Sequence, residues 1–216
     1  MKTPPCLVFD FDGTLADTLD MVLTLYNKIA PSYGCKPAGE EIRDRILQEP
    51  YHVLLKAYGV TSLKLAALMV RIRSEMGKQL AEVNVVEGIK EALFELKQQG
   101  YRLGVLTSNS KKNVCAFMQH NGLTEVFDFI YSGKNLFGKD KVMVQMLARE
   151  GLAKEAVLYV GDELRDIEAS RKVGLRVIAV TWGLFGKEAL EALNPDAVVE
   201  TSEELVTRVY ALTDSE

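Results

Sequence analysis

Residues 6–15 have the sequence Cys-Leu-Val-Phe-Asp-Phe-Asp-Gly-Thr-Leu. The run Cys6–Phe11 is apolar except for Asp10, and a glycine follows it at position 13. A short apolar run that ends in turn residues is typical of a strand buried on both faces of a parallel sheet. We therefore expect a strand over Cys6–Phe11, with the carboxylates of Asp10 and Asp12 at its carboxyl end.

From residue 87 onward, short runs rich in β-branched residues alternate with longer segments in which apolar residues recur every three or four positions. The strand-like runs are Tyr101–Thr107, Phe129–Ser132, Ala156–Gly161 and Leu175–Val180. The helical segments are Glu87–Gln99, Ser110–Asn121, Asp140–Glu150 and Glu163–Val173, and a glycine follows each of them. This alternation predicts an α/β fold with a Rossmann-like, doubly wound parallel sheet flanked by helices.

The stretch between the first strand and this alternating region has a different pattern. It contains helical segments but no strand-like run, and the segments are Leu19–Ser32, Glu41–Gln48, Tyr51–Tyr58 and Leu63–Leu80. Glycine and proline residues separate them, as in a compact bundle with short connections. We therefore expect residues 1–16 and 84–216 to form the α/β core, and residues 17–83 to form an inserted bundle of about four helices.

Composition excludes several classes of protein. With 48% hydrophobic residues, 26% charged residues and a net charge of −4, the chain is typical of a soluble globular protein and lacks the basic character of nucleic-acid binders. Its three scattered cysteines do not suggest a disulfide framework or a zinc site. We expect no signal peptide and no membrane span, and hence a cytoplasmic protein.

Polar side chains follow several of the predicted strands. Ligands of doubly wound sheets bind at the carboxyl ends of the strands, which makes these positions candidates for a functional site. Asp10 and Asp12 are two residues apart in an extended segment, so their side chains leave on the same face. Asp162 ends a later strand and adds a third carboxylate. A group of hard oxygen ligands predicts a Mg²⁺ site.

The remaining residues at these strand ends suit a phosphoryl group. The hydroxyl of Thr107 or Ser108 can donate to a phosphoryl oxygen, and the ammonium group of Lys139 can neutralise its charge. A carboxylate beside a divalent cation can attack phosphorus, while a second carboxylate acts first as general acid and then as general base. These residues favour phosphoryl transfer to an aspartate.

Four motifs along the chain resemble, in order and spacing, the signature motifs of the haloacid dehalogenase superfamily. They are Asp10-Phe11-Asp12-Gly13-Thr14-Leu15, then Leu106-Thr107-Ser108-Asn109, the lysine of Gly138-Lys139, and Val160-Gly161-Asp162 with Asp166. The helical insert after the first motif resembles the small helical cap of the phosphoglycolate-phosphatase-like branch. The resemblance therefore covers the whole core and implies that residues 17–83 are a cap domain.

The resemblance also implies a role for each motif residue. Asp10 would be the nucleophile and a Mg²⁺ ligand, and Asp12 would be the general acid/base whose backbone carbonyl also binds the metal. Asp162 would be the third protein ligand, with Asp166 supporting the metal site from behind the direct ligands. Thr107 and Lys139 would hold the phosphoryl oxygens, which completes the expected set. An aspartate at position 12 favours phosphate chemistry over carbon–halogen cleavage.

Some assignments stay open at this point. The family's lysine is often followed by proline, whereas Asp140 and Lys141 follow Lys139, so Lys141 is a rival for its role. Asp17 could belong to the site, but its position favours a helix N-cap. Asn109 is expected as a turn or cap residue. The insert residues that could contact a substrate are Arg43, Arg45, Tyr51, His52 and Lys56.

These observations lead to one principal hypothesis and two alternatives. The principal hypothesis is a Mg²⁺-dependent phosphatase, a phosphoric monoester hydrolase that acts on a small phosphorylated metabolite through an aspartyl-phosphate. One alternative is a phosphomutase of the same fold, and the other is a non-catalytic binding protein. The expected partner is a small metabolite, not a nucleic acid or a membrane. The sequence specifies neither the physiological substrate nor the oligomeric state.

Overall fold

The structure, a computed structural model, describes residues 5–49, 51–77, 79–133 and 138–213. Its centre is a six-stranded parallel sheet in the order β3-β2-β1-β4-β5-β6. The strands are β1 (Cys6–Phe9), β2 (Arg102–Thr107), β3 (Phe129–Ser132), β4 (Val157–Gly161), β5 (Arg176–Val180) and β6 (Ala197–Val199). The prediction of a Rossmann-like, doubly wound α/β fold is confirmed.

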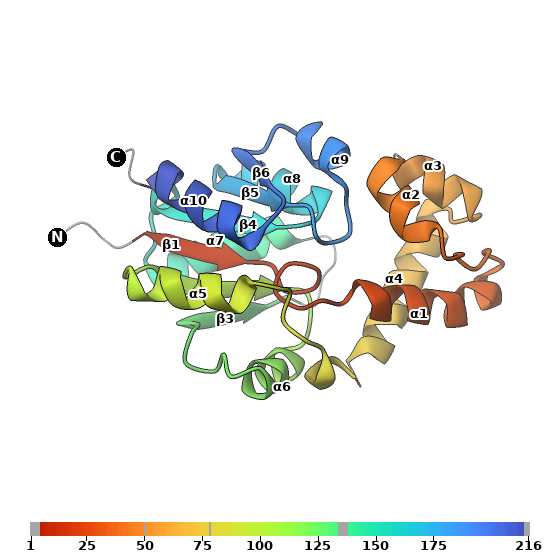
Figure 1. The fold of residues 1–216 in the computed structure, drawn as a ribbon, viewed down its shortest axis with the longest axis horizontal. Coiled ribbons are helices and arrows are strands. Elements are labelled where there is room, and N and C mark those ends of the chain that lie inside the picture. The colour runs from red at the N-terminus through yellow and green to blue at the C-terminus, as the bar shows by residue number, and fades with distance from the viewer. Residues whose placement is uncertain (1–4, 50, 78, 134–137, 214–216) are drawn as a thin grey trace.

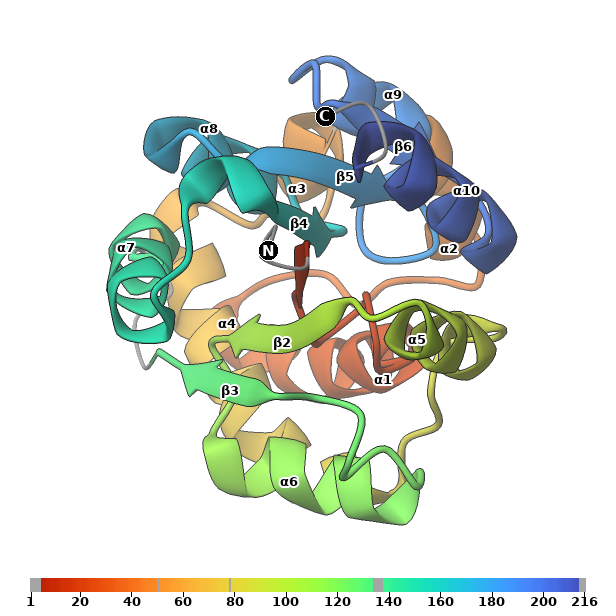
Figure 2. The ribbon, with the colours of Figure 1, turned by 90° about the vertical axis from the view of Figure 1, so that its left-hand side faces the viewer.

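Helices cover both faces of this sheet (Figure 2). The helices of this layer are α5 (Ile89–Gln98), α6 (Lys111–His120), α7 (Lys139–Glu150), α8 (Leu164–Val173), α9 (Lys187–Glu191) and α10 (Ser202–Thr213). Alternate residues of β1 point to opposite faces: Leu7 and Phe9 pack in a core with α5, α6 and α10, while Cys6 and Val8 pack in a core with α7, α8 and α9. Burial on both faces explains why β1 is apolar throughout.

β1 is two residues shorter than the sequence predicts. The backbone N–H of Asp10 still donates to the carbonyl of Val160 at 2.8 Å, but the carbonyl of Phe11 accepts the N–H groups of Leu15 and Ala16, both at 3.0 Å. These bonds close a tight turn through Gly13, whose φ of 79° lies in the left-handed region that favours glycine. The turn therefore takes the chain out of the sheet directly after Asp10.

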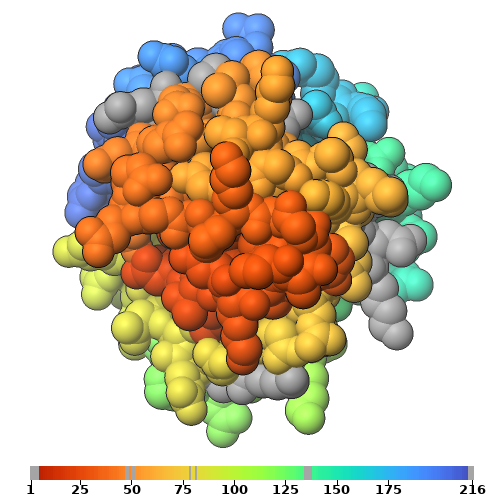
Figure 3. All heavy atoms as spheres, turned by 90° about the vertical axis from the view of Figure 1, so that its right-hand side faces the viewer, coloured from red at the N-terminus to blue at the C-terminus, as the bar shows by residue number. Residues whose placement is uncertain are grey.

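The segment between β1 and α5 forms four helices at the carboxyl ends of the strands (Figure 1). They are α1 (Leu19–Ile29), α2 (Ile42–Gln48), α3 (Tyr51–Ala57) and α4 (Ser62–Met76), with short 3₁₀ helices at Ala30–Tyr33 and Leu80–Glu82. The two ends of this segment lie side by side where they join the sheet. Ala16 and Val85 form an antiparallel bridge there, and the backbone N–H of Asp17 donates to the carbonyl of Asn84 at 3.0 Å. Seen from this end, these helices form the face towards the viewer (Figure 3).

Two details of the helices differ from the sequence prediction. The expected single helix up to Leu80 ends at Met76 and resumes as a 3₁₀ helix, and α1 ends at Ile29 before a 3₁₀ turn that contains Pro31. The residue that precedes α1 is Thr18, so the prediction of Asp17 as N-cap is wrong, and Thr18 makes no side-chain capping bond. Across the described residues, no helix combines the length and apolar character that a membrane crossing needs.

Candidate active site

Asp10 lies at the centre of the site because β1 is an inner strand and ends just before it. Its side chain is only 3% exposed, and one carboxylate oxygen lies 2.8 Å from the ammonium nitrogen of Lys139. Burial raises the pKa of Asp10, but the positive charges of Lys139 and Arg165, together with hydrogen bonds from Lys139 and the Phe11 backbone, outweigh this effect and hold the pKa below its ordinary value. Asp10 is therefore an ionised carboxylate at neutral pH.

Asp162 follows β4, the neighbour of β1, and is held by two other loops. The hydroxyl of Thr14 donates to Oδ1 at 2.8 Å, and the backbone N–H of Leu184 donates to Oδ2 at 2.8 Å. Gly183 comes so close that a Cβ there would collide with the Asp162 carboxylate. The loops after β1 and β5 thus fix the direction of this carboxylate, and a side chain at Gly183 would displace it.

Asp166 lies in the first turn of α8 and is fully buried. Its Oδ2 accepts the backbone N–H of Glu163 at 3.1 Å, and its Oδ1 contacts the ammonium group of Lys139. Burial raises the pKa of Asp166 to about 7, although the charge of Lys139 opposes this rise. Asp166 thus forms an ion pair with Lys139, whereas Lys141, on the same helix as Lys139, is exposed.

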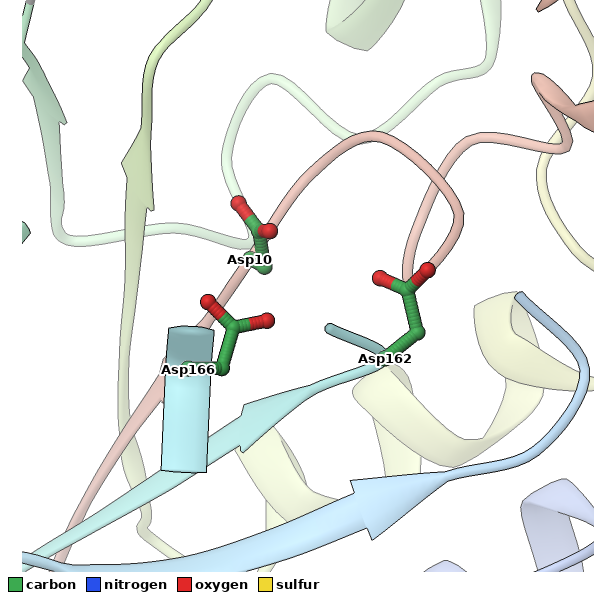
Figure 4. A group of neighbouring side chains, drawn as sticks. All are labelled: Asp10, Asp162 and Asp166. Carbon is green, nitrogen blue, oxygen red and sulfur yellow. The ribbon is translucent and has the colours of Figure 1, made fainter. Parts of the chain in front are cut away.

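Together, Asp10, Asp162 and Asp166 form one group of carboxylates (Figure 4). Each offers an oxygen that lies within 4.8 Å of the others, and all three residues are buried. Burial, followed by the negative charges of Glu163 and Asp10, raises the pKa of Asp162 well above its ordinary value. Like charges this close need a cation, and carboxylate oxygens without His or Cys fit a hard divalent ion such as Mg²⁺.

Lys139 is the first residue of α7 and supplies one positive charge to this group. Its ammonium nitrogen contacts Asp10 and Asp166 and lies 5.3 Å from the centre of the Tyr159 ring. Burial lowers the pKa of Lys139, but the two carboxylates raise it above its ordinary value, so the lysine is charged. Lys141 is exposed on the same helix, away from this group.

The carboxylate of Asp12 has a different environment from that of Asp10. The amide nitrogen of Asn109 lies 3.3 Å from each Asp12 oxygen and donates to this carboxylate. Burial and the negative charge of Asp10 raise the pKa of Asp12 to about 6. Asp12 can therefore exchange a proton near neutral pH, as a general acid/base must.

Thr107 ends β2 and lies beside Lys139 at a cavity of about 10 Å³, which Ser108 and Arg165 also line. Its hydroxyl oxygen accepts the backbone N–H of Asn109 at 2.9 Å. Because that bond uses the oxygen as an acceptor, the hydroxyl hydrogen is available to donate to another acceptor.

The residues expected to contact substrate from the helical segment do not gather at this site. The guanidinium of Arg43 pairs with Asp20, and that of Arg45 pairs with Glu49 at 2.6 Å and 2.9 Å. His52 and Lys56 are exposed, and the side chain of Tyr51 lies outside the part of the structure that is described. Asp17, the other open candidate, is also exposed.

Sequence reasoning missed two other cations, and it assigned Asn109 only to a turn. Arg165, in the first turn of α8, donates to Glu163 at 2.6 Å and lines the cavity beside Thr107. Arg73 is a half-buried residue near the end of α4. Arg165 follows Asp162 by three residues, which was an available signal. The place of Arg73 depends on how α4 packs, for which the local sequence carries no signal.

A family model described as haloacid dehalogenase-like hydrolase matches residues 7–180 of the chain. The chain belongs to this family. Among curated proteins, this haloacid dehalogenase-like hydrolase is 36% identical to a phosphoglycolate phosphatase from Synechococcus elongatus, over 95% of this chain and 97% of the relative. The resemblance to the phosphoglycolate-phosphatase-like branch is confirmed, and the family and this relative together identify the chain as an enzyme of the phosphatase type.

Solved structures of more distant haloacid dehalogenase-like proteins share the fold. A predicted phosphatase from Clostridium acetobutylicum superposes with a TM-score of 0.77 at 21% identity, covering 97% of this chain and all of that one. A Thermotoga maritima protein assigned as a β-phosphoglucomutase superposes with a TM-score of 0.66 at 24% identity, covering 96% of this chain and 99% of that one. At these identities the likeness concerns the fold alone.

Proposed function

We propose that the chain is a Mg²⁺-dependent phosphatase that hydrolyses a small phosphorylated metabolite through an aspartyl-phosphate on Asp10. One observation carries the proposal: the ionised Asp10 carboxylate lies 2.8 Å from Lys139, within a buried group that also contains Asp162 and Asp166. A carboxylate nucleophile, a fixed ammonium group and a site for a divalent cation are the parts that phosphoryl transfer to an aspartate requires.

In the first half of the proposed reaction, a carboxylate oxygen of Asp10 forms a bond to phosphorus while the bond from phosphorus to the substrate oxygen breaks. Asp12 in its protonated form gives its proton to the leaving oxygen, which departs as an alcohol. In the second half, Asp12 takes a proton from water as that water attacks phosphorus. The acyl-phosphate bond then breaks, so inorganic phosphate leaves and the Asp10 carboxylate is restored.

The other site residues hold the phosphoryl group and the metal. Lys139 and the Thr107 hydroxyl bind phosphoryl oxygens, with Lys141 too exposed to share this role. The carboxylates of Asp10 and Asp162 and the backbone carbonyl of Asp12 are the proposed Mg²⁺ ligands, and Asp166 supports them from behind. Bound Mg²⁺ would neutralise negative charge on the carboxylates and on the phosphoryl oxygens.

Residues 17–83 are the proposed cap, and residues 1–16 and 84–216 the catalytic core. The bridge between Ala16 and Val85 supports a domain boundary at this point, because the two chain segments that connect the helices to the sheet lie next to each other there. A cap at the carboxyl ends of the strands can exclude bulk water from the intermediate and contact the organic part of the substrate.

The test is a screen of phosphorylated metabolites for phosphate release by the full chain, with Mg²⁺ and with a chelator. We expect turnover of at least one phosphomonoester with Mg²⁺ and none with the chelator. Asp10→Asn should abolish this turnover without changing the circular dichroism spectrum, while Asp17→Asn, an exposed residue of the same loop, should leave it intact. Substantial phosphate release by Asp10→Asn would exclude Asp10 as nucleophile.

The same screen separates the alternatives. A phosphomutase would isomerise sugar phosphates without releasing inorganic phosphate, because its intermediate returns the phosphoryl group to the substrate. A non-catalytic binding protein would turn over nothing, although all the residues named for catalysis are present. Either result would replace the phosphatase proposal.

A further inference from the structure

The end of α4 packs directly against the site. Gly77, which follows α4, lies so close to Asn113 that a Cβ at Gly77 would come within 2.6 Å of its amide nitrogen. That amide group donates to the side chain of Asn109 at 3.0 Å, and Asn109 donates to Asp12. Two hydrogen-bonded side chains, those of Asn113 and Asn109, thus lie between the end of α4 and the proposed general acid/base. Arg73 lies one turn before Gly77 on this helix.

Arg73 is half-buried, and none of the described residues forms a hydrogen bond or ion pair with its side chain. Within the described part of the chain, its guanidinium makes no hydrogen bond or ion pair, whereas Arg43, Arg45 and Arg71 in the same helical segment each pair with a carboxylate. A guanidinium carries five N–H donors in a planar fork, so partial burial without an acceptor costs free energy. This arrangement suits a bound anion as the missing partner.

The charges around Arg73 are those of the active site. Burial lowers the pKa of Arg73, the positive charge of Arg165 lowers it further, and the carboxylates of Asp12, Glu163 and Asp10 oppose this effect. The guanidinium groups of Arg165 on α8 and Arg73 on α4 thus both interact electrostatically with the carboxylates of Glu163 and Asp10. Arg165 pairs with Glu163 and lines the cavity with Thr107 and Lys139.

We propose that Arg73 binds a second anionic group of the substrate, so that the enzyme selects phosphomonoesters that carry a carboxylate or a second phosphate close to the reacting phosphoryl group. The inference rests on the proposed phosphatase function. Lys139 and Thr107 already serve the reacting phosphoryl group, and Arg165 is partly neutralised by Glu163. Among the described residues around the site, Arg73 is therefore the cation left for another charge. A planar guanidinium matches a carboxylate or a phosphate with two parallel hydrogen bonds.

Asp12 is the competing partner for Arg73 within the chain. Asn109 already donates to both Asp12 oxygens, and the general-acid step requires Asp12 to carry a proton, which weakens its attraction for a guanidinium. If Arg73 nevertheless served Asp12, its loss would slow the reaction of every phosphomonoester alike. If Arg73 binds the substrate, its loss affects only substrates with a second anion. This difference defines the experiment.

The experiment compares three phosphomonoesters with full-length protein. They are 2-phosphoglycolate, which has a carboxylate; 2-hydroxyethyl phosphate, which has a neutral group in its place; and ethylene glycol bisphosphate, which has a second phosphate. Wild-type protein should prefer one of the two probes that carry a second anionic group over 2-hydroxyethyl phosphate. In Arg73→Gln, kcat/KM for that probe should fall about 10- to 100-fold, mainly through KM, as expected for the loss of a charged hydrogen bond. For 2-hydroxyethyl phosphate it should change less than about threefold.

Arg71→Gln is the matched control, because Arg71 lies on the same helix but is exposed and pairs with Glu75 at 3.1 Å. It should leave the ratio of the probes unchanged. The ratio is measured on one protein sample, so a partly unfolded variant does not distort it. Equal losses on all probes in Arg73→Gln would overturn the inference, as would a wild-type enzyme without preference for a second anion. Absence of any wild-type turnover would instead contradict the phosphatase proposal itself.

Discussion

At the scale of single residues, Asn109 connects the proposed nucleophile loop to the next strand of the sheet. It donates from its side chain to Asp12, its backbone N–H donates to Thr107, and its backbone carbonyl accepts the hydroxyl of Ser132 at 2.5 Å. One residue thus orients the proposed acid/base and the proposed phosphoryl-binding hydroxyl together. Its hydrogen bond to Asp12 also lowers the pKa of that carboxyl group, against the effect of burial.

Asn109→Ala should therefore change both rate and pH dependence. We expect kcat/KM to fall about fivefold, which corresponds to about 1 kcal/mol for one modest hydrogen bond. The pKa of Asp12 should rise, because the variant loses a donor that stabilises the charged form. Since Asp12 must be protonated for the first step, the falling limb of the profile of kcat/KM against pH should move to higher pH.

Asn113→Ala provides the comparison for this measurement, because Asn113 contacts Asn109 without contacting Asp12. In Asn113→Ala, the falling limb of the profile of kcat/KM against pH should stay close to that of the wild type. A limb that is unmoved or shifted to lower pH in Asn109→Ala would show that Asn109 does not position Asp12 as the general acid.

At the scale of elements, the strands that carry the chemistry were the most predictable. β1, β2, β4 and β5 are buried on both faces, so their sequences are predominantly apolar runs that could be recognised, although β1 is two residues shorter than predicted. β6 has only three residues at the edge of the sheet, which is too short for a clear pattern. The helix α10 was missed although Leu205, Val206 and Val209 recur at helical spacing, a signal that was present in the sequence.

Asp128, the residue before β3, is bonded to both α5 and β2. Its Oδ2 accepts from the ammonium group of Lys97 on α5 at 2.6 Å and from the backbone N–H of Leu103 at 2.8 Å. Burial raises the pKa of Asp128, but these two donors outweigh it and hold the pKa below its ordinary value. The charged form of Asp128 therefore stabilises the fold above the unfolded pKa of about 3.9, and this contribution is lost as pH falls through the folded value.

We predict that Asp128→Asn lowers the free energy of unfolding at pH 7 by about 1 kcal/mol, a modest value because the side chain is partly exposed. The gap between variant and wild type should shrink as pH falls below about 4. Urea unfolding at a series of pH values measures this difference in the free energy of unfolding. Glu125→Gln, a change at an exposed carboxylate, is the control. A gap that stays constant down to pH 3 would contradict the assignment of this contribution to the carboxylate charge.

At the scale of the whole molecule, the site joins residues that are far apart in the sequence, and this limits what a sequence can predict. Asp10, Lys139 and Asp162 were predictable because each follows a recognisable strand end or begins a helix, and parallel strands bring those positions to one edge of the sheet. Arg73 was not, because its place depends on how α4 packs across the strand ends. Arg43 and Arg45 drew attention as cations that could contact a substrate, yet their partners Asp20 and Glu49 lie within the same helical segment, the proposed cap.

The central claim, a phosphoryl group carried by Asp10, has a direct measurement. Asp12→Asn removes the base that activates water. The intermediate should therefore accumulate when this variant is mixed with Mg²⁺ and 4-nitrophenyl phosphate, whose leaving group departs without needing a proton, and quenched in acid. Mass spectrometry of the digested protein should then find one added phosphoryl group on the peptide that contains Asp10, and none in Asp10→Asn. Phosphate release by the wild type, with no phosphorylated peptide in Asp12→Asn or with the group on another residue, would contradict the account.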